Sequence, residues 1–494
     1  MKIIKASYLA CSIAAALGSS AAYAVGPGVT PDFVFYYGGG SAEPQAIGAA
    51  TCRLMSNVDN YTSTAAGKPD GKYYILYGTT TAAHGSVPAN KNVMVIYKFN
   101  GGSYTNGGQP QSPATVGLPY PTVASITAGA TAIGTGAGTF CTPGNGTATF
   151  QSGTFTIETT NRQPDFGLTD LEVAAFNGIN NPIAPAALSL PGASVGIYDL
   201  VFGMAVTSQL SAQKHNFSYS EIAGILSGQI TNWNQLYGDN NQVLPAGDVI
   251  LLDRNVGSGH KTSSSAEFLG YPQLGALATQ PTSVVNGYQG GSDGAGTAPV
   301  VCAAGYQDVQ ETSAAGTVSD LKLLAASGCG LRAIGILSMD NPPGIAANQN
   351  VAGTNAYNFV QLNGTAVDTG TSGDDENGAV ATSYVNAIKG NYTDFYQAHF
   401  NTKTSGFLTS GTAGADFASA YLTQLRSATL PGCSGSPGAK FPGTMAGVIT
   451  DLDNATTLVG VTCVSVTSRN GNSDSPLFPF KTIPGNITLG SDPL

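Results

Sequence analysis

Residues 249–262 have the sequence VILLDRNVGSGHKT, and this stretch indicates the class of the fold. It begins with a continuous apolar run, which is typical of a strand that is buried on both faces of a sheet. A Gly-Ser-Gly turn follows at 257–259, and a helical pattern then continues to Phe268. Strands that alternate with helices in this way build α/β proteins. We therefore predict an α/β fold.

The turn after this strand carries groups that suit a negatively charged ligand. Arg254 precedes the turn, and Ser258 and Gly259 stand where the helix begins. The N–H groups at a helix N-terminus attract anions, and a guanidinium group donates parallel hydrogen bonds to an oxyanion. The alternative role for Arg254 is a salt bridge between two parts of the fold.

Three other loops also follow predicted strands. Residues 38–45 (GGGSAEPQ) lead from an apolar strand into a helical pattern, residues 101–103 (GGS) follow a second strand, and residues 165–170 (DFGLTD) place two carboxylates in a short turn. Taken singly, a glycine-rich turn is more often plain architecture, and such carboxylates are usually solvated or cap a helix. Because ligands of open α/β sheets bind at the carboxyl ends of the strands, we expect these loops to converge.

Composition and charge narrow the classes of function. The chain has 494 residues, of which 65 are glycine, 42% are hydrophobic and 10% are charged, and this is typical of a globular protein with two or three packed lobes. Its formal net charge of -10 argues against binding to nucleic acid or to anionic lipid, because both need basic surfaces. An anion would therefore be bound by local backbone dipoles and one or two arginines, against an unfavourable overall field.

The first residues of the chain, 1–24, are typical of a secretory signal. Lys2 and Lys5 precede a short apolar stretch, and residues 22–24 (AYA) have the small-x-small pattern of a cleavage site. A membrane anchor is the alternative, but the apolar stretch is well short of the ~20 residues that span a bilayer. We expect no transmembrane segment after cleavage and predict an exported protein, either periplasmic or secreted to the cell exterior.

An even number of cysteines in an exported chain predicts disulfide bonds. Six cysteines follow the signal, and they allow fifteen pairings. None stands in a C-x-x-C pattern and the four histidines have no ligand spacing, so we expect neither a metal site nor a cofactor. Proximity in the sequence favours the pairs Cys302–Cys329 and Cys433–Cys463, which leaves Cys52–Cys141.

A hydrolase is the enzymatic alternative. Residues 290–294 (GGSDG) fit the pattern G-x-S-x-G, but no strand precedes them and no helix follows, so chance explains the match better. Ser258 and His260 are near neighbours, yet residues this close on a turn rarely meet as nucleophile and base. We therefore expect a binding protein and not an enzyme.

The order of the four loops resembles a known family. Residues 218–234 (SYSEIAGILSGQITNWN) resemble the helix and loop of the phosphate-binding proteins of phosphate ABC transporters, and residues 253–262 resemble the R-x-D-G-S-G-T loop of that family. Residues 38–45 are similar to the G-G-G-A-T-L-P-Q opening of its secreted DING branch, and residues 165–170 are similar to its D-F-G-x-S-D segment. In this order the motifs resemble those of the type 2 periplasmic binding fold.

The resemblance implies two α/β lobes with a discontinuous first lobe and hinge strands between them. After the signal peptide at 1–24, we expect the first lobe at 25–198, the second at 199–354, and a return to the first lobe with a C-terminal extension at 355–494. A Gly/Thr-rich insertion near 105–160 is expected to form β-strands. The implied function is that of an exported solute-binding protein, which binds phosphate between the lobes and delivers it to the permease of an ABC transporter.

The resemblance also assigns a binding site position by position. The amides of Ala42 and Glu43 and the hydroxyl of Ser103 correspond to donors in the family's first two loops. Asp170 corresponds to the carboxylate that accepts the ligand's proton, so it selects hydrogen phosphate or arsenate and rejects sulfate. The fourth loop contributes Arg254, Ser258, Gly259 and His260.

Three positions depart from the family's pattern. Val256 replaces the aspartate that orients the arginine, so either Asp253 holds Arg254 or the guanidinium group is less rigid. His260 replaces a threonine and either adds positive charge near the anion or blocks it, and Glu43 places a carboxylate where the family has an apolar residue. The missing aspartate, the insertion and the extra length support an alternative: a secreted or surface protein that keeps the scaffold for adhesion, matrix or envelope structure, without high-affinity phosphate binding.

Overall fold

The structure is a computed structural model. Cys52, on helix α2 (Pro44–Leu54), is disulfide-bonded. The other cysteines, the expected signal peptide at 1–24 and the G-x-S-x-G match at 290–294 lie outside the residues that the structure describes, so the cysteine pairing stays a prediction. The described residues are 28–65, 68–69, 73–99, 102–108, 117–128, 131–132, 150–153, 155–178, 180–183, 192–271, 305–328, 330, 332–339, 341, 343, 354–366, 385–388, 392–426, 448–449, 467–468, 478–483 and 486–489.

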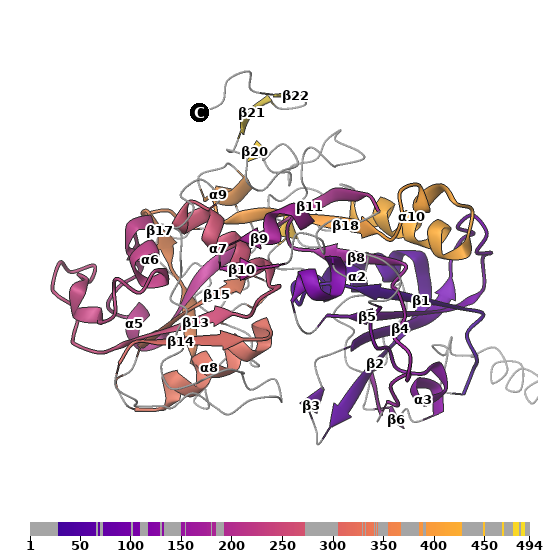
Figure 1. Ribbon diagram of the computed structural model, residues 1–494, viewed down its shortest axis with the longest axis horizontal. Helices are drawn as coiled ribbons and strands as arrows, with labels where there is room; N and C mark the ends of the chain where they lie inside the picture. The colour runs from indigo at the N-terminus through magenta and orange to yellow at the C-terminus, as the bar shows by residue number, and fades with distance from the viewer. Residues whose placement is uncertain are drawn as a thin grey trace, which may run out of the picture.

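One large mixed sheet organises the chain (Figure 1). Its strands are β1 (Phe33–Gly38), β2 (Met55–Ala65), β3 (Lys68–Pro69), β4 (Tyr73–Thr80), β5 (Asn92–Lys98), β6 (Thr131–Ala132), β7 (Phe150–Gly153), β8 (Phe166–Thr169), β11 (Ser194–Thr207), β13 (Val249–Arg254), β14 (Gln307–Glu311), β15 (Arg332–Ser338), β16 (Tyr357–Phe359), β18 (Phe395–Thr402) and β19 (Val448–Ile449). They are hydrogen-bonded in the order β14-β13-β15-β11-β18-β8-β1-β5-β4-β2-β7-β6, while β16 and β19 pair with β11 and β3 pairs with β2. β1 is parallel to β5 and β8, and β13 is parallel to β14 and β15, whereas β11 is antiparallel to β15 and β18.

Helices pack against this sheet at several places. Helix α2 lies beside α10 near β1, while α7 and α8 contact β13 and β15 (Figure 1). Besides α2, the helical elements of the described residues are η1 (Tyr104–Gly108), α3 (Val123–Ala128), η3 (Val173–Phe176), α5 (Ser208–Ser211), α6 (Tyr219–Leu226), η4 (Trp233–Gln235), α7 (Gly259–Leu269), α8 (Ala314–Ala326), α9 (Val385–Ile388), η6 (Phe407–Thr409) and α10 (Ala413–Leu425). Short strands form three small sheets: β9 (Asn177–Gly178) with β10 (Asn181–Pro182), β12 (Asn216–Phe217) with β17 (Gln361–Leu362), and β20 (Thr467–Ser468) with β21 (Phe478–Ile483) and β22 (Asn486–Leu489). The predicted α/β class is confirmed, and the described part of 105–160 holds η1 and α3 as well as the strands β6 and β7.

The stretch from β13 to α7 folds as its sequence predicts. All six residues of β13 are buried, and parallel strands flank it on both sides. Gly257 has a φ of 91°, which lets the chain turn before α7 begins at Gly259. Gly270 ends the helix in the left-handed conformation with a φ of 66°, as glycine commonly does at this position.

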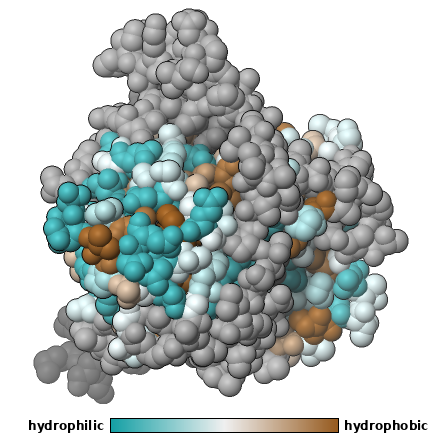
Figure 2. Space-filling model, turned by 60° about the vertical axis from the view of Figure 1, so that its left-hand side comes forward, coloured by the Kyte–Doolittle hydropathy of each residue, from teal (hydrophilic) through white to brown (hydrophobic). Residues whose placement is uncertain are grey.

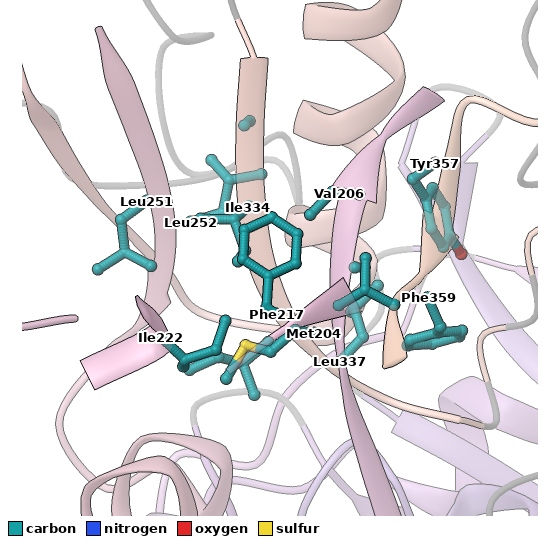
Figure 3. Packing of buried hydrophobic residues seen from close by; sticks show 14 of the residues in the cluster. Met204, Val206, Phe217, Ile222, Leu251, Leu252, Ile334, Leu337, Tyr357 and Phe359 are labelled. Carbon is teal, nitrogen blue, oxygen red and sulfur yellow. The ribbon is translucent and has the colours of Figure 1, made fainter. Parts of the chain in front are cut away.

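Buried apolar side chains form three clusters. One surrounds β13, β15 and the later part of β11, and Figure 3 shows part of its packing. The other two lie around β1, β4, β5 and β8. β11 contributes Met204 to the first cluster and Leu200 to the second, so it links the two regions, with β18 beside it (Figure 1). Each fully buried side chain of this size contributes about 1.5–3 kcal/mol to the stability of these cores.

The visible surface near α5 and α6 is mainly polar. Figure 2 shows hydrophilic residues around small, separate groups of hydrophobic ones on this face. Tyr237 and Val243, which are 57% and 53% exposed, are large hydrophobic residues that face solvent in this part of the chain. Within the described ranges, no helix has the length and apolar character needed to cross a membrane.

Candidate functional site

Four loops that follow β1, β5, β8 and β13 bring buried polar side chains together. We call this group, with Gly40 and Gly259, the loop cluster. Its six polar side chains are each at most 2% exposed, although such burial costs free energy unless the groups find partners. These side chains are Glu43, Ser103, Asp170, Arg254, Ser258 and His260.

The first three loops converge above Gly40. A Cβ atom at this position would stand 2.7 Å from Asp170 Oδ1 and 2.7 Å from Glu43 Oε2. The same point lies 2.8 Å from the Cβ atom of Ser103. A side chain at position 40 would therefore occupy the space onto which two carboxylates and a serine converge.

The fourth loop closes against the second and third. A Cβ atom at Gly259, the first residue of α7, would collide with the carboxyl group of Asp170, so that carboxylate lies directly against the N-terminus of the helix. Tyr104 N donates a hydrogen bond of 3.0 Å to Gly257 O, which joins the loop after β5 to the turn before α7. A Cβ atom at Gly102 would stand 2.6 Å from the same carbonyl oxygen, so glycine is needed for this approach.

Two polar side chains hold the loop after β1 in place. The hydroxyl of Tyr97 on β5 donates to Gly40 O at 2.9 Å and lies 3.4 Å from Glu43 Oε2. Asn106 Nδ2 donates to Gly39 O at 3.2 Å. Burial, and then the nearby Glu43, raise the pKa of Tyr97 well above its ordinary value, so this hydroxyl stays protonated. Ala42 is also buried, at 1% exposed, in the loop that these contacts fix.

Neutral acceptors orient Arg254. Its Nε donates to Glu311 O at 3.2 Å and its Nη2 to Thr312 O at 3.4 Å. Asp253, which the sequence offered as a partner for this arginine, accepts a hydrogen bond from Lys261 Nζ instead. Val256 is 42% exposed and points away from the buried cluster. Backbone carbonyls at the end of β14 therefore take the orienting role that the aspartate has in the resembled family.

The ring of His260 has a defined tautomer. Arg254 Nη1 lies 3.3 Å from His260 Nδ1, and since a guanidinium group only donates, Nδ1 accepts and the ring proton is on Nε2. Burial, and then the charge of Arg254, lower the pKa of His260 well below its ordinary value, so the ring is neutral. Phe202 of β11 packs edge-on against it, with ring centroids 4.6 Å apart. His260 is thus a neutral N–H donor and does not add the positive charge considered from the sequence.

Three buried polar atoms of the loop cluster have no hydrogen-bond partner within the described residues. They are Ser103 Oγ, Asp170 Oδ1 and His260 Nε2. Leaving such an atom unsatisfied costs about 1–3 kcal/mol, so a ligand that supplied the missing partners would recover this free energy. The set combines two donors with an acceptor, beside a guanidinium group and the N-terminus of α7. It suits an oxyanion that carries at least one proton.

A second group of buried charges lies next to the loop cluster. Asp253 of β13, Lys261 of α7 and Asp308 of β14 are all at most 3% exposed. Burial, and then the charge of Asp253, raise the pKa of Asp308 to about 7, while Lys261 acts in the opposite direction. Asp308 was not anticipated from the sequence, although a carboxylate inside the strand sequence QDVQE at 307–311 is a signal that could have revealed it.

The structure places every site residue assigned by resemblance in one buried region. Ala42 and Glu43 lie in the first loop, Ser103 in the second and Asp170 in the third, and the rest belong to β13 and the start of α7. Among the described residues, no group of three or more His, Cys, Asp or Glu side chains could hold a metal ion. The carbonyls of Glu311 and Thr312 were not anticipated, because a backbone acceptor leaves no signature in the sequence.

Comparisons with known proteins give structural neighbours only. No protein-family model matches the chain, and no curated protein matches it. It is similar to an ABC-type phosphate transport receptor from Vibrio cholerae (13% identity, 52% of this chain and 74% of that chain, TM-score 0.27) and to a phosphate binding protein from Stenotrophomonas maltophilia (14% identity, 75% of this chain and 78% of that chain, TM-score 0.30). A DING protein is a further neighbour, with 12% identity over 87% of this chain and 100% of that chain and a TM-score of 0.30. The chain is thus a mixed α/β protein that has phosphate-binding proteins among its structural neighbours.

Proposed function

We propose that this chain is an exported solute-binding protein whose loop cluster binds an inorganic oxyanion, with phosphate as its ligand. One observation carries the proposal: Ser103 Oγ, Asp170 Oδ1 and His260 Nε2 are buried without partners within the described residues. They lie beside Arg254 and the N-terminus of α7, which favour negative charge. The order of the loops in the sequence, which resembles that of phosphate-binding proteins, agrees with this assignment.

Each group of the cluster has a distinct role in this proposal. Arg254 supplies the positive charge, and the amide of Gly259 supplies the dipole of the helix N-terminus. Ser258 N instead donates to Asn255 O at 3.2 Å. His260 Nε2–H and the hydroxyl of Ser103 donate to ligand oxygens. Asp170 accepts a hydrogen bond from an O–H group of the ligand, so a protonated oxyanion completes the site and sulfate leaves a buried acceptor unsatisfied.

The architecture offers a way for the ligand to enter a buried site. We infer two lobes joined by the long strands β11 and β18, where the sequence predicts the first at 25–198 with a return at 355–494 and the second at 199–354. The apolar clusters on the two sides of these strands are separate, which supports two lobes, but residues 356–362 and 387–395 contribute to the cluster around β13 and β15, so we place the return to the first lobe at β18. Because the cluster is almost inaccessible to solvent, binding and release require the lobes to move apart about these strands. Delivery of the ligand to an ABC transporter is the role that the resemblance implies.

Calorimetric titration of the mature protein with phosphate tests this function. The protein is first unfolded and refolded to remove ligand carried through purification, and sulfate is the competing anion. We expect tight binding of phosphate that sulfate does not displace. Absence of heat and of a thermal shift at millimolar phosphate would refute phosphate binding and favour the scaffold alternative.

A matched pair of variants ties the binding to the loop cluster. Arg254→Lys keeps a positive charge but loses the planar group that donates to several acceptors at once, so we expect at least about tenfold weaker phosphate binding. Arg162→Lys is the control, because Arg162 forms an exposed ion pair with Glu158 outside the cluster. Equal affinities for the two variants would remove Arg254 from the site.

A further inference from the structure

Glu43 brings a second carboxylate into the loop cluster. It occupies the N-cap position of α2, but its side chain does not cap that helix. Its Oε2 and Asp170 Oδ1 each stand 2.7 Å from the Cβ position of Gly40, so the two carboxylates lie close to each other. Glu43 is fully buried and Asp170 is 2% exposed, so solvent does not screen the two carboxylates from each other.

A second carboxylate changes which form of an oxyanion fits. A carboxylate beside an anion is repulsive unless the anion donates a hydrogen bond to it, and here two carboxylates lie together against Gly40. Hydrogen phosphate carries one proton and two negative charges, so it can satisfy one acceptor and is repelled by the other. Dihydrogen phosphate carries two protons and a single charge, and it can donate to both.

We propose that Glu43 is a second hydrogen-bond acceptor of the site, so that the chain binds phosphate in its doubly protonated, singly charged form. This inference rests on the proposed function. It makes the binding of total phosphate weaker as the pH rises through the second ionisation of the ligand. A site with one acceptor that prefers the dianion has the opposite dependence, because the dianion becomes more abundant over the same range.

The other groups that face Glu43 and Asp170 do not compete as a source of this pH dependence. Tyr97 of β5, which interacts with Tyr198 of β11, has a pKa raised well above its ordinary value and stays neutral. His260 of α7 has a pKa lowered well below its ordinary value and is also neutral. Arg254 of β13 stays charged. The pH dependence that we expect near neutral pH therefore comes from the second ionisation of the ligand.

Phosphate titrations between about pH 6 and about pH 8 test the inference. For the unmodified protein we expect the dissociation constant for total phosphate to rise with pH, with a slope that approaches about tenfold per pH unit. Glu43→Gln replaces the acceptor by an amide that also donates, so we expect this slope to vanish and binding above neutral pH to improve. Glu158→Gln is the matched control, because it removes one carboxylate outside the cluster.

Two further measurements keep the test decisive. Asp308→Asn removes a nearby group whose pKa is about 7, and the slope must survive this change if it comes from the ligand. Phosphite, whose singly charged form has one O–H group in place of two, should bind the unmodified protein at least about tenfold more weakly than phosphate. This comparison needs no variant, so it holds even if Glu43→Gln fails to fold.

The outcomes separate this inference from the proposed function. Phosphate binding that stays constant or strengthens above neutral pH, or phosphite binding equal to that of phosphate, overturns the role of Glu43 and leaves the binding function standing. Absence of phosphate binding at every pH overturns the proposed function itself.

Discussion

The exchange of Asp170 for asparagine tests the origin of selectivity. Asp170 is 2% exposed, and its Oδ1 has no partner among the described residues. A protonated phosphate donates to this oxygen a charge-assisted hydrogen bond that contributes about 1.5–3 kcal/mol. Sulfate has no proton at neutral pH and leaves the same acceptor buried and unsatisfied, at a cost of about 1–3 kcal/mol.

These two contributions set the size of the expected effect. Even their lower limits add to more than 2 kcal/mol, and about 3 kcal/mol corresponds to roughly a hundredfold preference for phosphate over sulfate. Asp170→Asn removes the charge and supplies an amide that donates to sulfate oxygens. Because Glu43 still faces the ligand, we expect the preference to fall at least about tenfold without reaching unity.

Calorimetry with phosphate and with sulfate measures this ratio directly. Asp165→Asn is the matched control, since it changes the same residue type at the opposite end of β8. Asp165 accepts from Tyr36 N and forms an ion pair with Lys403 outside the cluster, so its replacement should lower stability and leave the ratio unchanged. A ratio that is the same in Asp170→Asn and in the unmodified protein would refute the argument that a buried acceptor excludes sulfate.

Three further predictions concern neighbouring residues. His260→Phe keeps an aromatic ring but loses the Nε2–H donor and the acceptor for Arg254. Calorimetry should therefore show phosphate binding that is at least about tenfold weaker than in the unmodified protein. This factor should be the same at every pH between about 6 and about 8. Gly40→Ala places a methyl group against both carboxylates of the cluster, so phosphate binding should be lost while circular dichroism stays native; retained affinity would move the ligand away from this point. The folded-state pKa of Asp308 is raised to about 7, so the free energy of unfolding falls as the pH rises from about 4 to about 7; Asp308→Asn should remove this dependence, and parallel melting curves of the two proteins would contradict the assignment.

The local features of the site could be predicted from the sequence. The run of apolar residues at 249–252, the glycine turn and the helical pattern after it are encoded by neighbouring residues, and the structure has them as β13 and α7. The convergence of the loops after β1, β5, β8 and β13 follows from a general property of α/β sheets, in which ligand-binding loops gather at the carboxyl ends of strands.

The partners of individual side chains could not be predicted in the same way. Arg254 donates to the carbonyls of Glu311 and Thr312, which are more than fifty residues away and would accept with any side chain. Asp253 has two basic residues within reach in the sequence, and it binds Lys261 because the helix brings that side chain over the strand. These partners depend on packing between segments that are distant in the sequence, and a local motif contains no information about such packing.

The changes at positions 256 and 260 are connected by the geometry of Arg254. Without an aspartate at 256, the guanidinium group is oriented by two carbonyls and by Nδ1 of His260. His260 therefore acts on both sides of its ring: its Nδ1 is an acceptor for Arg254, and its Nε2–H is a donor that faces away from that contact.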